Sequence, residues 1–280
     1  MATDSKEAAE EWARKKSDER QKRLPDFLYK FRFFATSHDS TVLERALIGR
    51  ELYWQSPINF NDPFDCAPTF TYAASKSKKE TYEKDIVNRL NPGVPRSKRL
   101  MLRSKMRKKS PKSVEREMAS SQEEMRRQIS LCCLTENCTH PLMWAHYADS
   151  HQGLCLRMTL DDTDRDWMAF PVTYQRERPV VDIIGKKVSE LLDLVALTKA
   201  DFWSYEQEWR TIDQKAGAGY RKLGKGRIDG VIIGALMPNS KQEELFDIIE
   251  RSGLRIETFR ASIDPKVYGL NIRSHKRGVR

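Results

Sequence analysis

The fold depends on the stretch Trp203-Ser204-Tyr205-Glu206-Gln207-Glu208-Trp209-Arg210, which holds two carboxylates, one guanidinium and three large aromatic rings. If it forms a β-strand, alternate side chains point to opposite faces of a sheet. Glu206, Glu208 and Arg210 then share one face. The aromatic side chains share the other: Trp203, Tyr205 and Trp209. Such a charged face is typical of a ligand site, and equally of an exposed edge strand with ion pairs. We take the three charged residues as the candidate catalytic group.

Segments on both sides of this stretch have strand and helix patterns in no regular order. Short apolar runs predict strands at 27–32, 51–55, 129–134, 154–158, 172–174, 230–234 and 254–259. Helical spacing and capping residues predict helices that begin at Thr41, Thr139 and Ser240, and a longer helix over 183–202. Without a βαβα rhythm or an internal repeat, the pattern favours an α+β fold with a mixed or mainly antiparallel sheet.

The length of 280 residues is sufficient for one large domain with its own core. We expect a polar N-terminal helix or flexible segment at 1–24, a single α+β domain at 25–271 and a basic tail at 272–280. A helical insertion is predicted within the domain at 75–128, broken near 91–95 and 110–111, where prolines interrupt the pattern.

Positive charge dominates the composition, with 50 Lys and Arg against 40 Asp and Glu. Much of the excess lies in the insertion and in the tail, which predicts attraction to polyanions such as nucleic acid. A solvated helix would have the same composition.

The five cysteines form an odd set and no secretory signal begins the chain, which predicts a cytoplasmic protein. No run approaches the ~18 apolar residues that cross a bilayer, so we expect no membrane association. Cys132 and Cys133 would face opposite sides of a strand, and the paired spacing of zinc ligands is missing, so no metal site is expected.

Two segments have the mixture of polar and aromatic side chains that ligand pockets contain. The turn-rich loop at 56–65 places Asn61 and Asp62 among bulky apolar residues, although the same residues are ordinary turn formers. The short segment 141–148 adds Trp144, His146 and Tyr147, of which the histidine equally fits a structural role. The common phosphate-binding, esterase and zinc-protease motifs do not occur.

Four segments together resemble the bacterial domain of unknown function family 2971. They are 28–32, 56–66 with its Phe-Asn-Asp-Pro-Phe-Asp core, 141–148 with the following His-Gln-Gly, and 205–210. The resemblance covers roughly residues 27 to 260, and it implies no reaction.

The order of these segments is also similar, at the level of fold, to ADP-ribosyltransferases of the DNA-modifying toxin type. Those enzymes have a first strand with His or Arg, an aromatic residue followed by Ser-Pro, and a late strand with a catalytic Glu. The implied matches are Lys30 or Arg32, Tyr53, Ser56-Pro57 and Glu208. This chain lacks the first-strand His of the pattern.

The resemblance implies NAD as cofactor, and an ADP-ribosyltransferase or NAD glycohydrolase that acts on a macromolecular acceptor, as toxins and defence effectors do. Glu208 would stabilise the oxocarbenium-like transition state, and Glu206 would deprotonate the acceptor. Repulsion between the two carboxylates would raise the pKa of Glu206, and Arg210 would offset part of that repulsion. The residues expected to bind the nucleotide are Tyr29, Lys30, Arg32, Tyr53, Ser56, Asn61, Asp62, Trp144, His146 and Tyr147.

Two alternatives remain open from the sequence. A nuclease could use Asp62, Asp65, Glu206 and Glu208 to hold Mg²⁺. A nucleic-acid-binding module without catalysis would need only the basic insertion and the aromatic residues.

Overall fold

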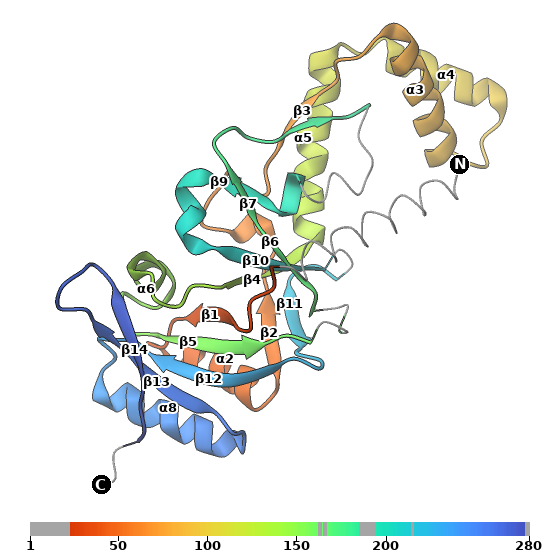
Figure 1. Cartoon of the computed structure of the whole chain (residues 1–280). Coiled ribbons are helices and arrows are strands. Elements are labelled where there is room, and N and C mark those ends of the chain that lie inside the picture. Colours follow the sequence, from red (N-terminus) through yellow and green to blue (C-terminus); the bar gives the residue numbers. More distant parts are fainter. Residues whose placement is uncertain (1–22, 162–163, 165–166, 185–193, 214–215, 278–280) are drawn as a thin grey trace.

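An eight-stranded sheet forms the centre of the computed structural model, which describes residues 23–161, 164, 167–184, 194–213 and 216–277 (Figure 1). Its strands lie in the order β14 (Leu270–Ser274), β13 (Glu257–Ile263), β12 (Arg227–Ile233), β5 (Leu154–Thr159), β1 (Leu28–Arg32), β4 (Ser130–Thr135), β10 (Glu208–Asp213) and β6 (Ala169–Pro171). Neighbouring strands are antiparallel, except for the parallel pair β12 and β13. The predicted α+β fold with a mainly antiparallel sheet is confirmed.

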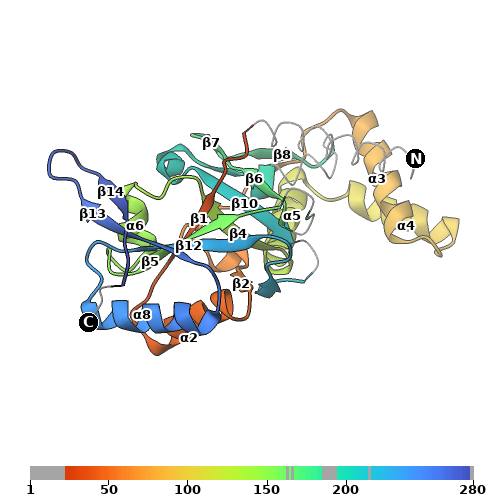
Figure 2. The same ribbon diagram turned by 60° about the horizontal axis from the view of Figure 1, so that its bottom comes forward.

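Helices cover both faces of this sheet. On one face, α2 (Ser37–Leu47) and α8 (Asn239–Ser252) lie side by side, as Figure 2 shows. On the other, the short helix α6 (Pro141–Tyr147) buries Met143 and Trp144. Alternate residues of β12 divide between the two cores, because Val231 packs in the cluster that contains α2 and α8, whereas Ile232 packs in the cluster that contains α6.

The unit β12–α8–β13 forms as predicted for 230–259. Helix α8 ends where Gly253 adopts a left-handed φ of 65°, in agreement with the expected glycine stop. Its beginning differs from the prediction, because the N-cap residue is Pro238 and Ser240 lies in the first turn.

The insertion consists of α3 (Lys76–Leu90), α4 (Arg96–Arg107) and α5 (Pro111–Gln128), with breaks at the predicted prolines. Ser75 and Ser110 cap α3 and α5 by accepting a hydrogen bond from a backbone N–H in the first turn. Figure 1 shows α3 and α4 projecting away from the sheet, whereas α5 returns to it. Among the described helices, none combines the length and apolar character that a membrane span requires.

Three two-stranded sheets surround the central one: β2 (Glu51–Trp54) with β11 (Gly219–Lys222), β3 (Thr69–Thr71) with β8 (Val180–Asp182), and β7 (Thr173–Gln175) with β9 (Thr198–Ala200). The loop after β2 contains a short 3₁₀ helix, η1 (Pro57–Asn59). The N-terminal segment predicted for 1–24 lies, up to residue 22, outside the described part of the chain. The predicted tail is wrong at its beginning, because 272–274 belong to β14.

The stretch 203–210 is not a single strand, which corrects the prediction. Glu206 ends a 3₁₀ helix, η3 (Asp201–Glu206), and Glu208 begins β10. Between them, Gln207 has left-handed backbone angles, with φ 43° and ψ 52°. This reversal breaks the alternation on which the common face depended. It also separates the aromatic residues, since only Trp209 belongs to the sheet.

Other helix boundaries also differ. Residues 185–193 of the predicted helix over 183–202 lie outside the described part, and its last residues form β9 and the start of η3 instead. Helix α2 begins at Ser37, because Thr36 and Asp39 form a reciprocal capping box that precedes Thr41. Helix α6 is capped by the side chain of His140, not by Thr139.

Candidate functional site

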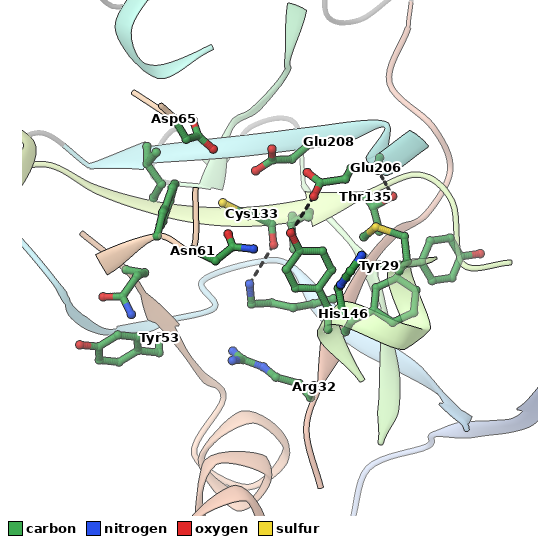
Figure 3. Close-up of a pocket in the computed structure, with 18 of the residues that line it drawn as sticks. Tyr29, Arg32, Tyr53, Asn61, Asp65, Cys133, Thr135, His146, Glu206 and Glu208 are labelled. Carbon is green, nitrogen blue, oxygen red and sulfur yellow. Dashed lines mark hydrogen bonds between the residues drawn. The ribbon is translucent and has the colours of Figure 1, made fainter. Parts of the chain in front are cut away.

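A pocket of about 550 Å³ opens where β1 and β4 diverge within the sheet (Figure 3). Strand β1 pairs with β5 along its whole length, but with β4 only at Tyr29 and Thr135. Beyond that pair, Lys30 Nζ donates a hydrogen bond to the carbonyl oxygen of Cys133 at 2.8 Å and bridges the two strands. The volume is in the range of small-molecule and cofactor sites.

Nine of the thirteen predicted site residues line this pocket: Tyr29, Lys30, Arg32, Tyr53, Asn61, His146, Tyr147, Glu206 and Glu208. They come from β1, β2, the loop after η1, α6, η3 and β10. Segments that lie far apart in the sequence therefore converge on one cavity. Their chemical roles stay predictions.

The acidic wall of the pocket is organised by Arg210, which is completely buried. Its guanidinium donates two hydrogen bonds to Asp65, at 2.9 and 2.6 Å, and two to Glu208, both at 2.8 Å. A further bond at 2.9 Å reaches the carbonyl oxygen of Ala196. This double bidentate arrangement fixes the orientation of both carboxylates.

Lys199 joins the second carboxylate to the same cluster. Its Nζ donates to Glu206 and, at 3.2 Å, to Glu208, and it lies 3.6 Å from Asp65. The hydroxyl of Tyr147 donates to the other oxygen of Glu206 at 2.7 Å. Three carboxylates and two cations therefore meet here, with a formal excess of one negative charge when all are ionised.

The two glutamates have opposite pKa shifts. Burial by itself would raise the pKa of Glu208, but Arg210 and Lys199 outweigh it and hold that pKa well below its usual range. The pKa of Glu206 is raised, mainly by burial and further by Glu208, with Lys199 opposing. This direction agrees with the sequence argument, but the compensating cation is Lys199, since Arg210 binds Glu208. Carboxylates with diverging pKa values are typical of acid–base pairs.

The opposite wall of the pocket is cationic. Arg32 lies across the cavity from the glutamates (Figure 3), and its Nε and Nη2 atoms are buried without a hydrogen-bond partner among the described residues. Burial lowers the pKa of this guanidinium. Next to it, Gly153 of the His-Gln-Gly motif lets a turn approach β1 closely, because a Cβ there would lie 2.2 Å from the carbonyl oxygen of Arg32.

Four predicted residues lie outside the pocket lining. Trp144 is fully buried in the core and donates to the carbonyl oxygen of Cys138, and Ser56 donates to that of Arg126. Asp62 accepts hydrogen bonds from Trp203 and from the Phe64 backbone. Arg210 acts through Asp65 and Glu208. These side chains contact residues that form the walls of the pocket, and they do not line the cavity themselves.

Lys199 is the residue that the sequence reasoning missed. It fell within the predicted helix over 183–202, and a lysine on a helix is usually a solvent-exposed residue without a special role. The available signal was its position after the apolar run Val195-Ala196-Leu197, since a lysine in such a run needs a buried partner.

The four carboxylates of the nuclease alternative do not come together as one group. Glu206 and Glu208 are bound by cations, and Asp62 points to Trp203. Within the described ranges, no group of three or more His, Cys, Asp or Glu side chains is arranged to hold a metal ion.

Comparison with protein families matches residues 143–211, which run from α6 to β10 and include His146, Tyr147, Lys199 and both glutamates. This segment matches the family described as Protein of unknown function (DUF2971). The match confirms the family resemblance stated from the sequence over this DUF2971 segment, and it does not extend to β1 or to the loop at 56–66. Comparisons with curated proteins and with solved structures give no match.

Proposed function

We propose that the pocket binds NAD and cleaves its nicotinamide–ribose bond, so that ADP-ribose passes to water or to a macromolecular acceptor. The observation that carries this proposal is the division of one cavity into an acidic wall, with Glu206 and Glu208, and a cationic wall, with Lys30 and Arg32. NAD has the complementary division, because its reacting ribose becomes positive in the transition state while its pyrophosphate is negative.

The pyrophosphate would occupy the cationic wall. Arg32 offers two donors that have no partner among the described residues, and Lys30 uses one of its three N–H groups on Cys133. A pyrophosphate supplies the missing acceptors and offsets the cost of burying the guanidinium. Tyr53, which lines the same cavity, offers an aromatic face for the nicotinamide ring.

Glu206 and Glu208 then have different roles in the reaction. Cleavage breaks the ribose C1′–N bond, and its electron pair leaves with neutral nicotinamide. Glu208 remains ionised, because its pKa is depressed, and it stabilises the oxocarbenium-like centre. Glu206, with a raised pKa, accepts the proton of the attacking water or acceptor as the new C1′–O or C1′–N bond forms.

The test is incubation of the purified protein with labelled NAD, alone and with a mixture of protein, DNA and RNA. We expect release of nicotinamide, and transfer of label if the mixture contains the acceptor. Glu206→Gln should lower this rate on the order of 10²–10⁴-fold, because the proton acceptor is lost. Absence of NAD consumption under all these conditions would overturn the proposal.

Substitution of Glu206 tests the mechanism more specifically than substitution of Glu208 does. Glu208 holds the buried Arg210 through two hydrogen bonds, so its substitution also disturbs the fold. A suitable control is Glu177→Gln, an exposed residue of the same type. Full retained activity of Glu206→Gln, with the control also active, would remove Glu206 from the mechanism.

A further inference from the structure

The helical insertion contains a run of 29 residues, 86–114, without a single Asp or Glu. Ten Lys and Arg lie within it, which equals the formal net charge of the whole chain. The rest of the protein is therefore balanced, with 40 cationic and 40 anionic side chains. Positive charge is concentrated on α4 and on the residues that connect it to α5.

The cations of α4 lie on two stripes of the helix, one that faces α3 and one that faces solvent. The inner stripe faces α3, where Arg99 donates to Asn88 and Arg107 pairs with Glu83 and Glu80. The outer cations of α4 are Lys98 and Lys105, followed by Lys108 just after the helix and Lys112 in the first turn of α5, all exposed. They form no ion pair with any residue in the described part of the chain. Because Glu80 and Glu83 of α3 pair with Arg107 on the inner stripe, these two carboxylates do not pair with the outer cations.

We infer that this outer face, defined by Lys98, Lys105, Lys108 and Lys112, is a binding surface for the phosphate backbone of a polynucleotide. A row of unpaired, solvated cations on a projecting helix is what sequence-independent backbone contact requires. An anionic membrane fits less well. Lys98, Met101 and Lys105 follow helical spacing along one stripe, so the exposed apolar side chains are mixed with the charges, whereas interfacial helices separate the two.

Helix α5 holds this face at a defined place relative to the pocket. At its far end, Arg126 donates to the carbonyl oxygens of Pro57 and Asp65, and Gln122 donates to that of Cys66. The 18 residues of α5 span roughly 27 Å at 1.5 Å per residue. A strand held by α4 covers that distance with about eight nucleotides at 3.4 Å each. The distance between the basic face and the pocket is relevant only if the pocket acts as proposed. Binding by the basic face does not depend on the activity of the pocket.

The experiment measures fluorescence anisotropy of a labelled 24-nucleotide DNA, single-stranded and duplex, with the full-length protein and no NAD. The test variant combines Lys98→Gln, Lys105→Gln and Lys108→Gln. The control combines Arg176→Gln, Arg255→Gln and Lys266→Gln, which removes the same charge from exposed positions elsewhere. Unfolding midpoints of both variants are compared with that of the wild type to verify folding.

We expect the affinity of the wild type to fall steeply with salt. The test variant should bind on the order of tenfold more weakly, with a salt slope on single strands smaller by about 2, because three phosphate contacts are lost. The control should differ from the wild type by less than about twofold.

Equal losses in the two variants, or no binding by the wild type, would overturn the proposal. Binding to phosphatidylserine vesicles as tight as that to DNA would assign the face to membranes instead. Because the assay contains no NAD, its outcome is separate from that of the proposed enzymatic function.

Discussion

The fully buried Arg210 and the half-buried Arg32 have opposite environments. Arg210 is bound on both sides by Asp65 and Glu208, whereas Nε and Nη2 of Arg32 have no partner among the described residues. We expect Arg32→Met to raise the free energy of unfolding of the ligand-free protein by about 1 kcal/mol or more, because it removes unsatisfied donors and keeps the stem. Arg210→Met should lower it by about 3–5 kcal/mol, because two carboxylates lose their partner. Urea unfolding at pH 7 measures both.

One result for these two variants would contradict the prediction. If Arg32→Met destabilises the protein as strongly as Arg210→Met, then Arg32 is held by structural contacts, and the cationic wall loses its free donors. A stabilising effect is typical of binding residues that are retained at the expense of the fold.

The pH dependence of stability should separate Glu206 from Glu208. The lowered pKa of Glu208 means that its ionised form stabilises the fold above about pH 4.5, and that this stability is lost as the pH falls through the folded value. The raised pKa of Glu206 has the reverse sign, so its contribution is lost as the pH rises above about 4.5. The deficit of Glu208→Gln should shrink from pH 7 to pH 3, whereas Glu206→Gln should gain relative to the wild type from pH 4.5 to 7. Parallel curves for the two variants in urea unfolding would contradict these directions.

At the scale of elements, the junction between η3 and β10 brings both glutamates to one cluster. The left-handed Gln207 ends η3 and starts the strand, and its side chain is exposed. Gln207→Val should lower the free energy of unfolding by about 1–3 kcal/mol, because β-branched residues are strained at positive φ. Gln207→Gly should stay within about 1 kcal/mol of the wild type. Thermal unfolding checks the pair, and equal values for Val and Gly would show that the junction relaxes.

The same junction shows where sequence-based prediction of elements ends. The insertion was predicted nearly to the residue, because the prolines that interrupt it are local signals. The prediction of a single strand over 203–210 was wrong, because a left-handed residue other than glycine has no clear sequence signature. The end of the helix over 183–202 was wrong for another reason. Thr198–Ala200 pairs with β7, and tertiary pairing of this kind outweighs local helix propensity.

At the scale of the whole molecule, the site is a consequence of the gap between β1 and β4. Residue types and motif order were sufficient to place Tyr29, Arg32, Asn61, His146 and Glu206 in one pocket. They could not distinguish residues that face the cavity from those that support its walls, since this depends on which side of a loop or helix meets the core. Trp144 and Asp62 are examples, because both bind neighbouring protein groups and do not line the cavity.

Ligand binding should stabilise the whole fold through this gap, because a ligand that binds only the native state adds RT ln(1 + [L]/Kd) to the free energy of unfolding. At 100 times its Kd, NAD should add about 2.7 kcal/mol, which raises the unfolding midpoint of a chain of this size by about 5 °C. Arg32→Met should lose most of this shift despite its higher starting stability, whereas the exposed control Arg176→Met should keep it. Differential scanning fluorimetry measures these shifts. An equal NAD shift in Arg32→Met and the wild type would mean that the unpaired guanidinium does not contact the nucleotide.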